Sequence, residues 1–251
     1  MRSGTDSEPA GAEVLGVPNA VLLAWNRAPA TTKGPKPRWT LERLLEAAVD
    51  LGDRGGIEAI TMSGLAKALG SGTMSLYRYV ESREDLVVLA SDRALGTPAV
   101  PEGGTWRERL RAWVLDLRRT YKEHPWLTAV PVGTEPLLPS YVRRLEAGLA
   151  CVEELGLPSG RAVTVLTLLW TYTRGDVEQD AELASAAEGR PPAEADRFFA
   201  ERLRGLGAGE DFARVLRALE ADRREPPASG DDEFLDAVEI ILNGVEATVS
   251  P

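Results

Sequence analysis

The amino-acid sequence predicts an all-α protein with two helical domains. Its 251 residues are rich in Ala, Leu, Arg and Glu, whereas aromatic residues make up only 6% of the chain, and this composition favours helices over strands. Apolar residues recur every three or four positions along several segments, which is the period of a helix with one buried face. We expect an N-terminal arm at residues 1–38, a small domain at 39–95 and a larger helical domain at 104–250.

Composition and cysteine content exclude several classes of protein. The single cysteine, Cys151, excludes an internal disulfide framework and a cysteine-rich zinc site within one chain. No apolar run approaches the roughly 20 residues that cross a bilayer. The first residues carry only Arg2 before acidic and small residues, which is not the pattern of a secretory leader. We therefore expect a protein of the reducing cytoplasm.

The charge is distributed unevenly along the chain. The formal net charge is −10, but residues 33–90 carry eight basic and eight acidic side chains, whereas residues 91–251 carry 19 basic and 28 acidic ones. The excess of acid thus lies outside the small domain. An acidic body repels phosphate, so it would favour one docking orientation if the small domain bound DNA.

The arm at residues 1–38 is rich in Pro, Gly, Ala and Thr, and we expect most of it to be disordered. It ends in a basic cluster formed by Lys33, Lys36 and Arg38. A short apolar patch at residues 21–25 could pack against the body, although its length is marginal for an independent helix.

Four short helices are expected in the small domain, at residues 40–55, 61–70, 73–80 and 82–96. Thr61 and Ser82 have side chains of the type that caps a helix N-terminus, and Asp85 stands three residues after Ser82, as in a capping box. Gly55 and Gly56 should end the first helix.

The larger domain is predicted to contain longer helices. One apolar stripe extends from Trp106 to Tyr121, and a second helix occupies residues 140–156. The stretch 163–172 is apolar on nearly every side, so its helix should be buried on two faces. Between residues 184 and 230, only residues 212–219 have a convincing helical pattern.

The last helix, at about residues 232–248, carries two apolar stripes. One stripe contains Phe234, Val238, Ile241 and Val245, and the other contains Leu235, Leu242 and Val249. One of them can face the protein's own core, whereas the other needs a partner. A homodimer that packs this helix and the 163–172 helix of each chain into a four-helix bundle meets that need.

The segment from Ile60 to Val80, ITMSGLAKALGSGTMSLYRYV, has the pattern of a helix-turn-helix. A short helix and a Gly-containing turn precede a second helix that begins with small hydroxyl residues and continues with aromatic ones. Such a second helix can enter a DNA major groove with its first residues nearest the base edges. From the pattern alone, a packed helical cluster with a solvated Tyr-Arg-Tyr face remains the alternative.

The run LAKALGSGTMSLYRYVESREDL resembles the DNA-binding domain of the TetR family of transcriptional regulators. That family pairs a Leu-Ala-x-x-Leu-Gly helix with a Leu-Tyr-x-Tyr or Leu-Tyr-x-His recognition helix, and TWRERLRAWVLDLRRTYKEHPWL is similar to the tetracycline-repressor branch. The resemblance implies DNA contacts by Thr61, Gly72, Thr73, Met74, Ser75, Tyr77, Arg78, Tyr79 and Arg83. Lys33, Lys36 and Arg38 would add flanking phosphate contacts.

The chain departs from the family pattern in two ways. Related sequences often have an Arg or Lys pair where this chain has Ser63 and Gly64, so the first helix should anchor the DNA backbone more weakly here. Ser71 stands where a buried Val is usual. We expect Ser71 to cap the recognition helix.

The resemblance also implies a small-molecule site in the larger domain. Aromatic walls suit a planar or polycyclic compound, although packing in the core is an equal alternative for each aromatic residue. The expected ligand contacts are Trp106, Trp113, Arg118, Tyr121, Trp126, Thr167, Trp170, Thr171 and Arg174.

No cofactor, metal site or catalytic group is expected. The only histidine, His124, stands at a helix end, where a solvated or capping role is expected. GLGAG at residues 205–209 lacks the preceding strand of a nucleotide loop and is interpreted as a linker. Cys151 is expected to pack within its helix.

The sequence therefore predicts a ligand-responsive repressor that binds a palindromic operator as a homodimer and is released by an aromatic small molecule. Two alternatives remain. One is a transcriptional activator of the same fold, and the other is a helical small-molecule-binding protein that has lost DNA binding, for which Ser63, Gly64 and Ser71 are the best support.

Overall fold

The computed structural model describes residues 17–27, 38–99, 103–131, 137–186, 192–207, 211–219 and 231–249. Within these ranges the regular structure consists of α-helices and short 3₁₀-helices, as the sequence predicts. The chain divides into two compact units, Met1–Leu166 and Thr167–Pro251. None of the described helices is long and apolar enough to cross a membrane.

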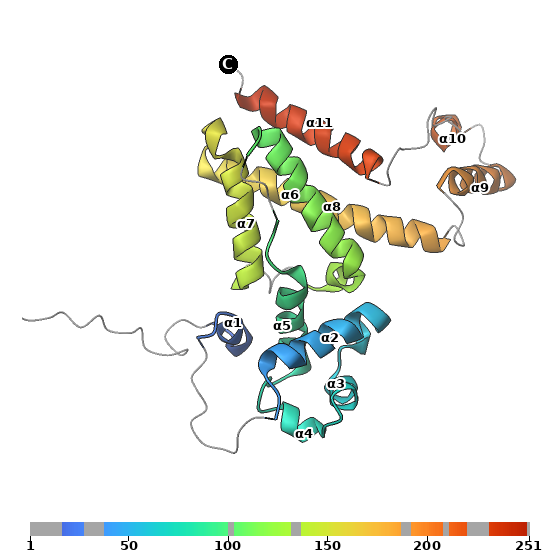
Figure 1. The fold of residues 1–251 in the computed structure, drawn as a ribbon. Coiled ribbons are helices and arrows are strands. Elements are labelled where there is room, and N and C mark those ends of the chain that lie inside the picture. Colours follow the sequence, from blue (N-terminus) through green and yellow to red (C-terminus); the bar gives the residue numbers. More distant parts are fainter. Residues whose placement is uncertain are drawn as a thin grey trace, which may run out of the picture. The chain divides into compact units, whose positions relative to one another are not determined.

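The helix-turn-helix segment of the first unit is built from four short helices and a 3₁₀ turn (Figure 1). These elements are α2 (Leu41–Gly55), η2 (Ile57–Ala59), α3 (Met62–Ala68), α4 (Thr73–Leu76) and α5 (Arg83–Leu95). Helix α2 packs against both α3 and α5, and α3 packs against α4. Their shared core is apolar and consists of Leu44, Ala48, Ile60, Leu65, Leu76, Val80, Leu86 and Leu89.

Side-chain caps begin three of these helices, and two of the caps were predicted from the sequence. The hydroxyl of Thr61 accepts a hydrogen bond from Gly64 N, and that of Ser82 accepts one from Asp85 N. Thr40 caps α2 in the same way. Each cap satisfies one backbone N–H that has no partner within its helix. Gly56 follows α2 with a φ of 71°, which confirms that the helix stops there.

The recognition helix differs from its prediction in two respects. Helix α4 ends at Leu76 rather than Val80, and residues 77–79 form a turn. Its N-cap is Gly72, with no side-chain cap, so the expected capping role of Ser71 is wrong. The Ser71 hydroxyl instead lies 2.6 Å from that of Ser75. Gly70, with a φ of 58°, makes the tight turn that leads into this segment.

Part of the N-terminal arm is helical. Helix α1 (Asn19–Ala24) packs against α5 and buries Ala20, Val21 and Leu22. The indole N–H of Trp25 donates to the carbonyl oxygen of Leu137 at 2.7 Å. Because tertiary packing supports it, a helix too short to be stable alone forms here, so the apolar patch at residues 21–25 does pack against the body.

The remainder of the first unit consists of longer α-helices and two short 3₁₀-helices. These are α6 (Trp106–Glu123), η3 (Pro125–Ala129), α7 (Pro139–Val152), η5 (Glu153–Leu155) and the start of α8 (Ser159–Ala186). A capping box begins α6, in which Thr105 and Glu108 each accept a hydrogen bond from the other's backbone N–H. Helix α7 packs against both α5 and α6, so α5 belongs to the helix-turn-helix core and also contacts α7.

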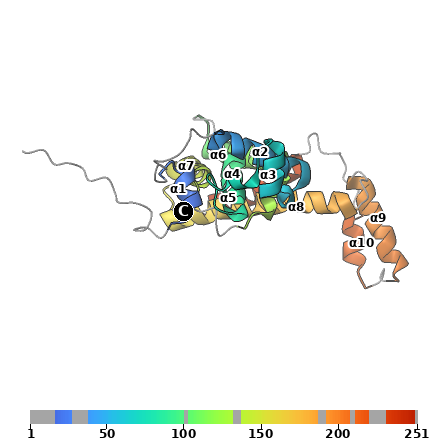
Figure 2. The same cartoon turned by 90° about the horizontal axis from the view of Figure 1, so that it is seen from below.

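The second unit contains the rest of α8, α9 (Pro192–Gly205), α10 (Ala213–Leu219) and α11 (Asp232–Val249). Helix α8 spans 28 residues, far beyond the apolar stretch 163–172. Helix α9 was not predicted, and it lies beside α10 (Figure 2). The rings of Tyr172 and Phe234 stack with centroids 5.5 Å apart and join α8 to α11.

Helix α8 carries an exposed stripe of residues without acidic side chains. The stripe consists of Gly160, Thr164, Thr167, Leu168, Thr171 and Gly175. Leu168 is 52% exposed. The sequence predicts burial of this helix on two faces, whereas the structure buries one face and leaves the stripe exposed within the single chain.

The apolar faces of α11 also differ from the prediction. Phe234, Val238, Leu242 and Val245 are buried, so Leu242 belongs to the chain's own core rather than to a second stripe. Ile240 is instead the exposed apolar residue of this helix, at 73%.

Candidate functional site

The recognition segment presents its two largest exposed apolar side chains at one place. Met74 is 82% exposed and Tyr77 is 46% exposed, whereas Leu76 on the opposite side is fully buried. Positions 74 and 77 are three residues apart, so both side chains lie on the same side of this turn. The core thus fixes the segment through Leu76 and leaves Met74 and Tyr77 at the surface.

Several polar side chains of the recognition segment form hydrogen bonds within the protein, while Thr73 is half-buried and Arg78 is exposed. Ser75 Oγ donates to the carbonyl oxygen of Gly72 at 2.6 Å and also bonds the Ser71 hydroxyl. The hydroxyl of Tyr79 accepts from Trp39 N at 3.1 Å and from Arg78 Nη2 at 2.9 Å. These bonds hold the segment in shape before any ligand is present.

The predicted DNA contact Arg83 lies against the helix-turn-helix core. Its guanidinium donates to the carbonyl oxygens of Ile60 and Ile57 and forms an ion pair with Glu58 at 3.0 Å. Arg83 therefore ties α5 to η2. Thr61 caps α3, and Arg38 is exposed and stacks over the Trp39 ring. Lys33 and Lys36 lie outside the described residues.

The backbone at Gly64 lies close to two neighbouring polar atoms. A Cβ atom at Gly64 would lie 3.0 Å from Thr61 Oγ1 and 3.1 Å from the Ala59 carbonyl oxygen. A long basic side chain at this position would require both neighbours to shift. Ser63 is exposed. That α3 anchors the DNA backbone more weakly than in related sequences remains a prediction.

Five of the predicted ligand contacts lie in the first unit, and most of them are packed in its core. Trp113 is fully buried and donates its indole N–H to the Arg144 carbonyl oxygen at 2.9 Å. Trp126 is buried and donates to Asp53 at 2.8 Å. Arg118 is also buried, whereas Trp106 is half-buried beside Arg107.

The other four predicted ligand contacts lie on α8 in the second unit. Trp170 is buried and Arg174 is half-buried, whereas Thr167 and Thr171 are exposed and belong to the stripe around Leu168. The four residues thus do not share one face of the helix. Their roles in ligand binding stay predictions.

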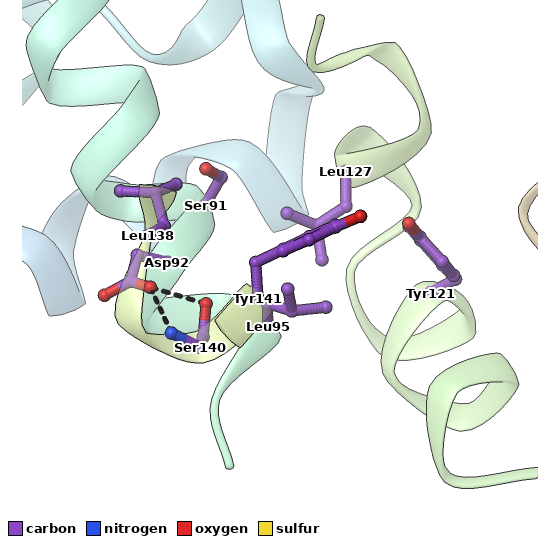
Figure 3. A pocket seen from close by; sticks show the side chains of 8 residues that line it. All are labelled: Ser91, Asp92, Leu95, Tyr121, Leu127, Leu138, Ser140 and Tyr141. Carbon is purple, nitrogen blue, oxygen red and sulfur yellow. Dashed lines mark hydrogen bonds between the residues drawn. The ribbon is translucent and has the colours of Figure 1, made fainter. Parts of the chain in front are cut away.

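A small cavity lies between α5, η3, α6 and α7 (Figure 3). It is lined by Ser91, Asp92, Leu95, Tyr121, Leu127, Leu138, Ser140 and Tyr141. Tyr121 is the one predicted ligand contact among these residues. The cavity measures about 10 Å³, which is room for about one water molecule.

Hydrogen bonds join α5, α6 and α7 around this cavity. Asp92 accepts from both the backbone N–H and the hydroxyl of Ser140 (Figure 3), and a carboxylate at the first turn of α7 is favoured by the helix dipole. Arg144 donates to Asp116 on α6 at 2.7 Å and to the Leu95 carbonyl oxygen at the end of α5 at 2.8 Å. Burial lowers the pKa of the Arg144 guanidinium, and its bond to Asp116 opposes that change.

A second junction joins the end of α6 to α2. His124 ends α6, as expected for a capping residue, and its Nδ1 lies 2.7 Å from Asp53 Oδ1 on α2. The same carboxylate oxygen accepts from Trp126. Asp53 therefore connects the helix-turn-helix segment to η3.

Comparison with protein families identifies both parts of the chain. Residues 44–90 match the model "Bacterial regulatory proteins, tetR family", and residues 97–249 match "Tetracyclin repressor-like, C-terminal domain". The chain belongs to the TetR family. Its members are regulators of transcription, which fits the exposed recognition segment described above.

Individual TetR-family relatives cover most of the chain. The repressor DrrR1 of Streptomyces coeruleorubidus is 32% identical over 236 residues, which are 91% of this chain and 85% of that protein. The class D tetracycline repressor of Escherichia coli is 25% identical over 219 residues, 85% of this chain and 92% of that protein. The crystal structure of ActR from Streptomyces coelicolor in complex with actinorhodin covers 87% of this chain and 100% of ActR, with 26% identity and a TM-score of 0.67.

Sequence reasoning missed the residues that connect the parts of this TetR-family protein. Asp53, Asp92, Asp116, Ser140 and Arg144 stand on amphipathic helices where charged and small polar residues are expected at the surface. Nothing in the local pattern distinguishes them from solvated side chains. Only the packing of α5, α6 and α7 shows that Arg144 and Asp116 are buried as a pair.

Proposed function

We propose that this TetR-family protein is a transcriptional repressor that binds a near-palindromic operator as a homodimer and releases it when an aromatic small molecule binds. The DNA-binding part of this proposal rests on the recognition segment, which buries Leu76 in the core and leaves Met74 and Tyr77 exposed. DrrR1, which shares 32% identity over nearly the whole chain, is named a repressor. Two recognition segments would enter successive major grooves roughly 34 to 36 Å apart.

The exposed apolar residues of α8 and α11 support the dimer. The stripe with Leu168 at its centre consists of glycine, threonine and leucine and can pack closely against a second helix. Ile240 is 73% exposed on α11. Isolated water-exposed apolar residues on two helices of one unit suit a four-helix bundle formed by two copies.

The cavity beside α5 is the place where we propose that the aromatic small molecule binds. Tyr121 and Tyr141 supply aromatic walls, and the related ActR has been crystallised in complex with actinorhodin. A space that holds about one water cannot hold such a molecule, so an effector that bound here would have to separate α6 and α7 from α5. The effector would thereby favour a conformer in which the cavity is open.

The α5 junction would carry this change to the DNA-binding segment. Helix α5 contacts α2 in the helix-turn-helix core and α7 beside the cavity, and Asp92 and Leu95 are bonded to α7. Displacement of α7 would therefore act on α5 directly. The effector can shift operator affinity by no more than the difference between its affinities for the two conformers.

The decisive experiment is operator binding by the purified protein. Fluorescence anisotropy with the DNA that flanks its own gene, across a salt series and against a scrambled duplex, should show preferential binding that weakens steeply with salt. If that DNA binds no better than the scrambled duplex, selection from random DNA follows. A failure to enrich any duplex there would overturn the proposal.

A further inference from the structure

In the helix-turn-helix segment, hydrophobic exposure is confined to the recognition segment. Among residues 38–99, Met74 and Tyr77 are the large apolar side chains that the structure leaves exposed. Met74 at 82% is also the more exposed of the two. Burial of this methionine against a partner would be favourable, and its place on the recognition segment makes DNA the partner to consider.

Several hydrogen-bonding groups around Met74 already have partners within the protein. The Ser75 hydroxyl is bonded to Gly72 and Ser71, and Arg78 lies along Tyr79. Arg83 donates to the carbonyl oxygens of Ile57 and Ile60, at the two ends of η2. The more exposed of the two large apolar side chains here is a thioether, which is at most a weak acceptor.

Base edges in the major groove differ in whether they carry an apolar group. Guanine, adenine and cytosine offer only donors and acceptors there, whereas thymine offers the methyl group on its C5 atom. Methionine is flexible and polarisable and packs well against such a group. An exposed methionine on a recognition helix is thus suited to distinguish thymine from the other bases.

We infer that Met74 is a specificity-determining residue whose side chain packs against the methyl group of a thymine in each half of the operator. The inference rests on the proposed DNA-binding function and adds the chemistry that is recognised. Burial of one methyl group is worth a factor of about four in affinity. The two symmetric half-sites together should therefore contribute about 15-fold.

The test replaces thymine by deoxyuridine, which removes only the methyl group. The probe is the duplex that the wild-type protein selects from a random library, with each thymine of one half-site and its symmetric counterpart replaced in turn. One of these replacements should weaken wild-type binding by about 15-fold in fluorescence anisotropy. The same replacement should change binding by Met74→Ala less than twofold, while Met74→Leu, the matched control, should retain most of the effect.

Other outcomes would overturn either the assignment of Met74 or the proposed DNA-binding function. If no replacement weakens wild-type binding, or if Met74→Ala stays as sensitive as the wild type, the assignment of Met74 is wrong although the protein still binds its operator. Sensitivity that disappears only in Tyr77→Ala would move the contact to Tyr77. If selection enriches no duplex, the proposed DNA-binding function itself fails, and the inference fails with it.

Discussion

Gly52 on α2 shows how tightly a single residue can couple the parts of the first unit. A Cβ atom at this position would lie 2.6 Å from Cε2 of Trp126 and 2.7 Å from its Nε1. The indole cannot move away without loss of its hydrogen bond to Asp53. Gly52→Ala should therefore destabilise the protein by about 1–3 kcal/mol, measured by urea unfolding.

A second substitution tests the cause of that effect. Trp126→Phe removes part of the ring that the new methyl group would meet, so Gly52→Ala should cost less in a Trp126→Phe background. Equal costs in the two backgrounds would show that the indole does not constrain Gly52.

The capping box at the start of α6 gives one pH dependence. Hydrogen bonds from the backbone and the hydroxyl of Thr105 lower the pKa of Glu108 from its usual value of 4.5. The ionised form therefore stabilises the folded state above about pH 4.5, and this stabilisation is lost as the pH falls through the lowered pKa.

The variant Glu108→Ala should accordingly show its largest loss of Tm near neutral pH. The Tm difference from the wild type should shrink as the pH is lowered below 4.5. Glu123→Ala, at an exposed site in the last turn of α6, is the control and should show no such trend. A Tm difference for Glu108→Ala that stays constant with pH would argue against the box.

Local sequence patterns predicted two of the helix N-caps but not which polar side chains form hydrogen bonds with distant parts of the chain. Thr61 and Ser82 cap their helices as expected, because an N-cap depends only on the three residues that follow it. Ser71 does not, because Gly72 takes the N-cap position. The contacts of Arg83 with Ile57 and Ile60 span more than 20 positions, so no local pattern could reveal them.

At the scale of elements, short helices depend on what they pack against. Helix α1 is too short to be stable alone, yet it buries Leu22 against the body. Leu22→Ala should cost about 2 kcal/mol of unfolding free energy, the low end for a buried leucine, because only a six-residue helix is anchored there.

A matched control separates burial from composition in this measurement. Leu206→Ala makes the same chemical change at a side chain that is 81% exposed, and it should alter stability by less than about 0.5 kcal/mol. Equal effects of the two substitutions would mean that α1 is not held against α5.

The helices that sequence analysis misjudged lack a continuous apolar stripe. The second half of α8 carries Asp176, Glu178, Asp180 and Glu182 and buries Val177, so its pattern resembles a solvated segment. In α9, Ala200 is buried, a small residue that contributes little to a hydrophobic period. Such helices are identified from their packing rather than from their sequence.

The junction of α5, α6 and α7 depends on one buried ion pair. Arg144 and Asp116 are both almost completely buried. Arg144→Met would leave the Asp116 charge with only Arg119 as its ionic partner, and the Leu95 carbonyl oxygen would lose its bond from Arg144. Loss of one partner of a buried pair costs about 3–5 kcal/mol.

Hydrogen exchange should show that this loss is shared by three helices. Amide exchange should accelerate in α5, α6 and α7 together in Arg144→Met, since the guanidinium contacts all three. The double variant Asp116→Leu with Arg144→Met should recover much of the stability, because no uncompensated charge is left. Faster exchange confined to α7 would mean that Arg144 does not join the helices energetically.

At the scale of the whole molecule, the proposed repression requires two copies to act together. A single helix-turn-helix can occupy only one half-site, whereas a dimer binds both halves with one loss of translational freedom. Leu168 lies at the centre of the exposed α8 stripe. Leu168→Glu would place two like charges across the proposed symmetric interface, at a cost of several kcal/mol.

That cost should raise the dimer dissociation constant by at least 100-fold, since each 1.4 kcal/mol is a factor of ten. Light scattering at micromolar concentration should then show a monomer, with an unchanged helical circular dichroism spectrum, and operator affinity should fall steeply. Val215→Glu, at an exposed site on α10, should leave the dimer intact. If Leu168→Glu remained dimeric and bound the operator normally, two copies would have to meet through a surface other than the α8 stripe, and the recognition segments would be spaced by that surface instead.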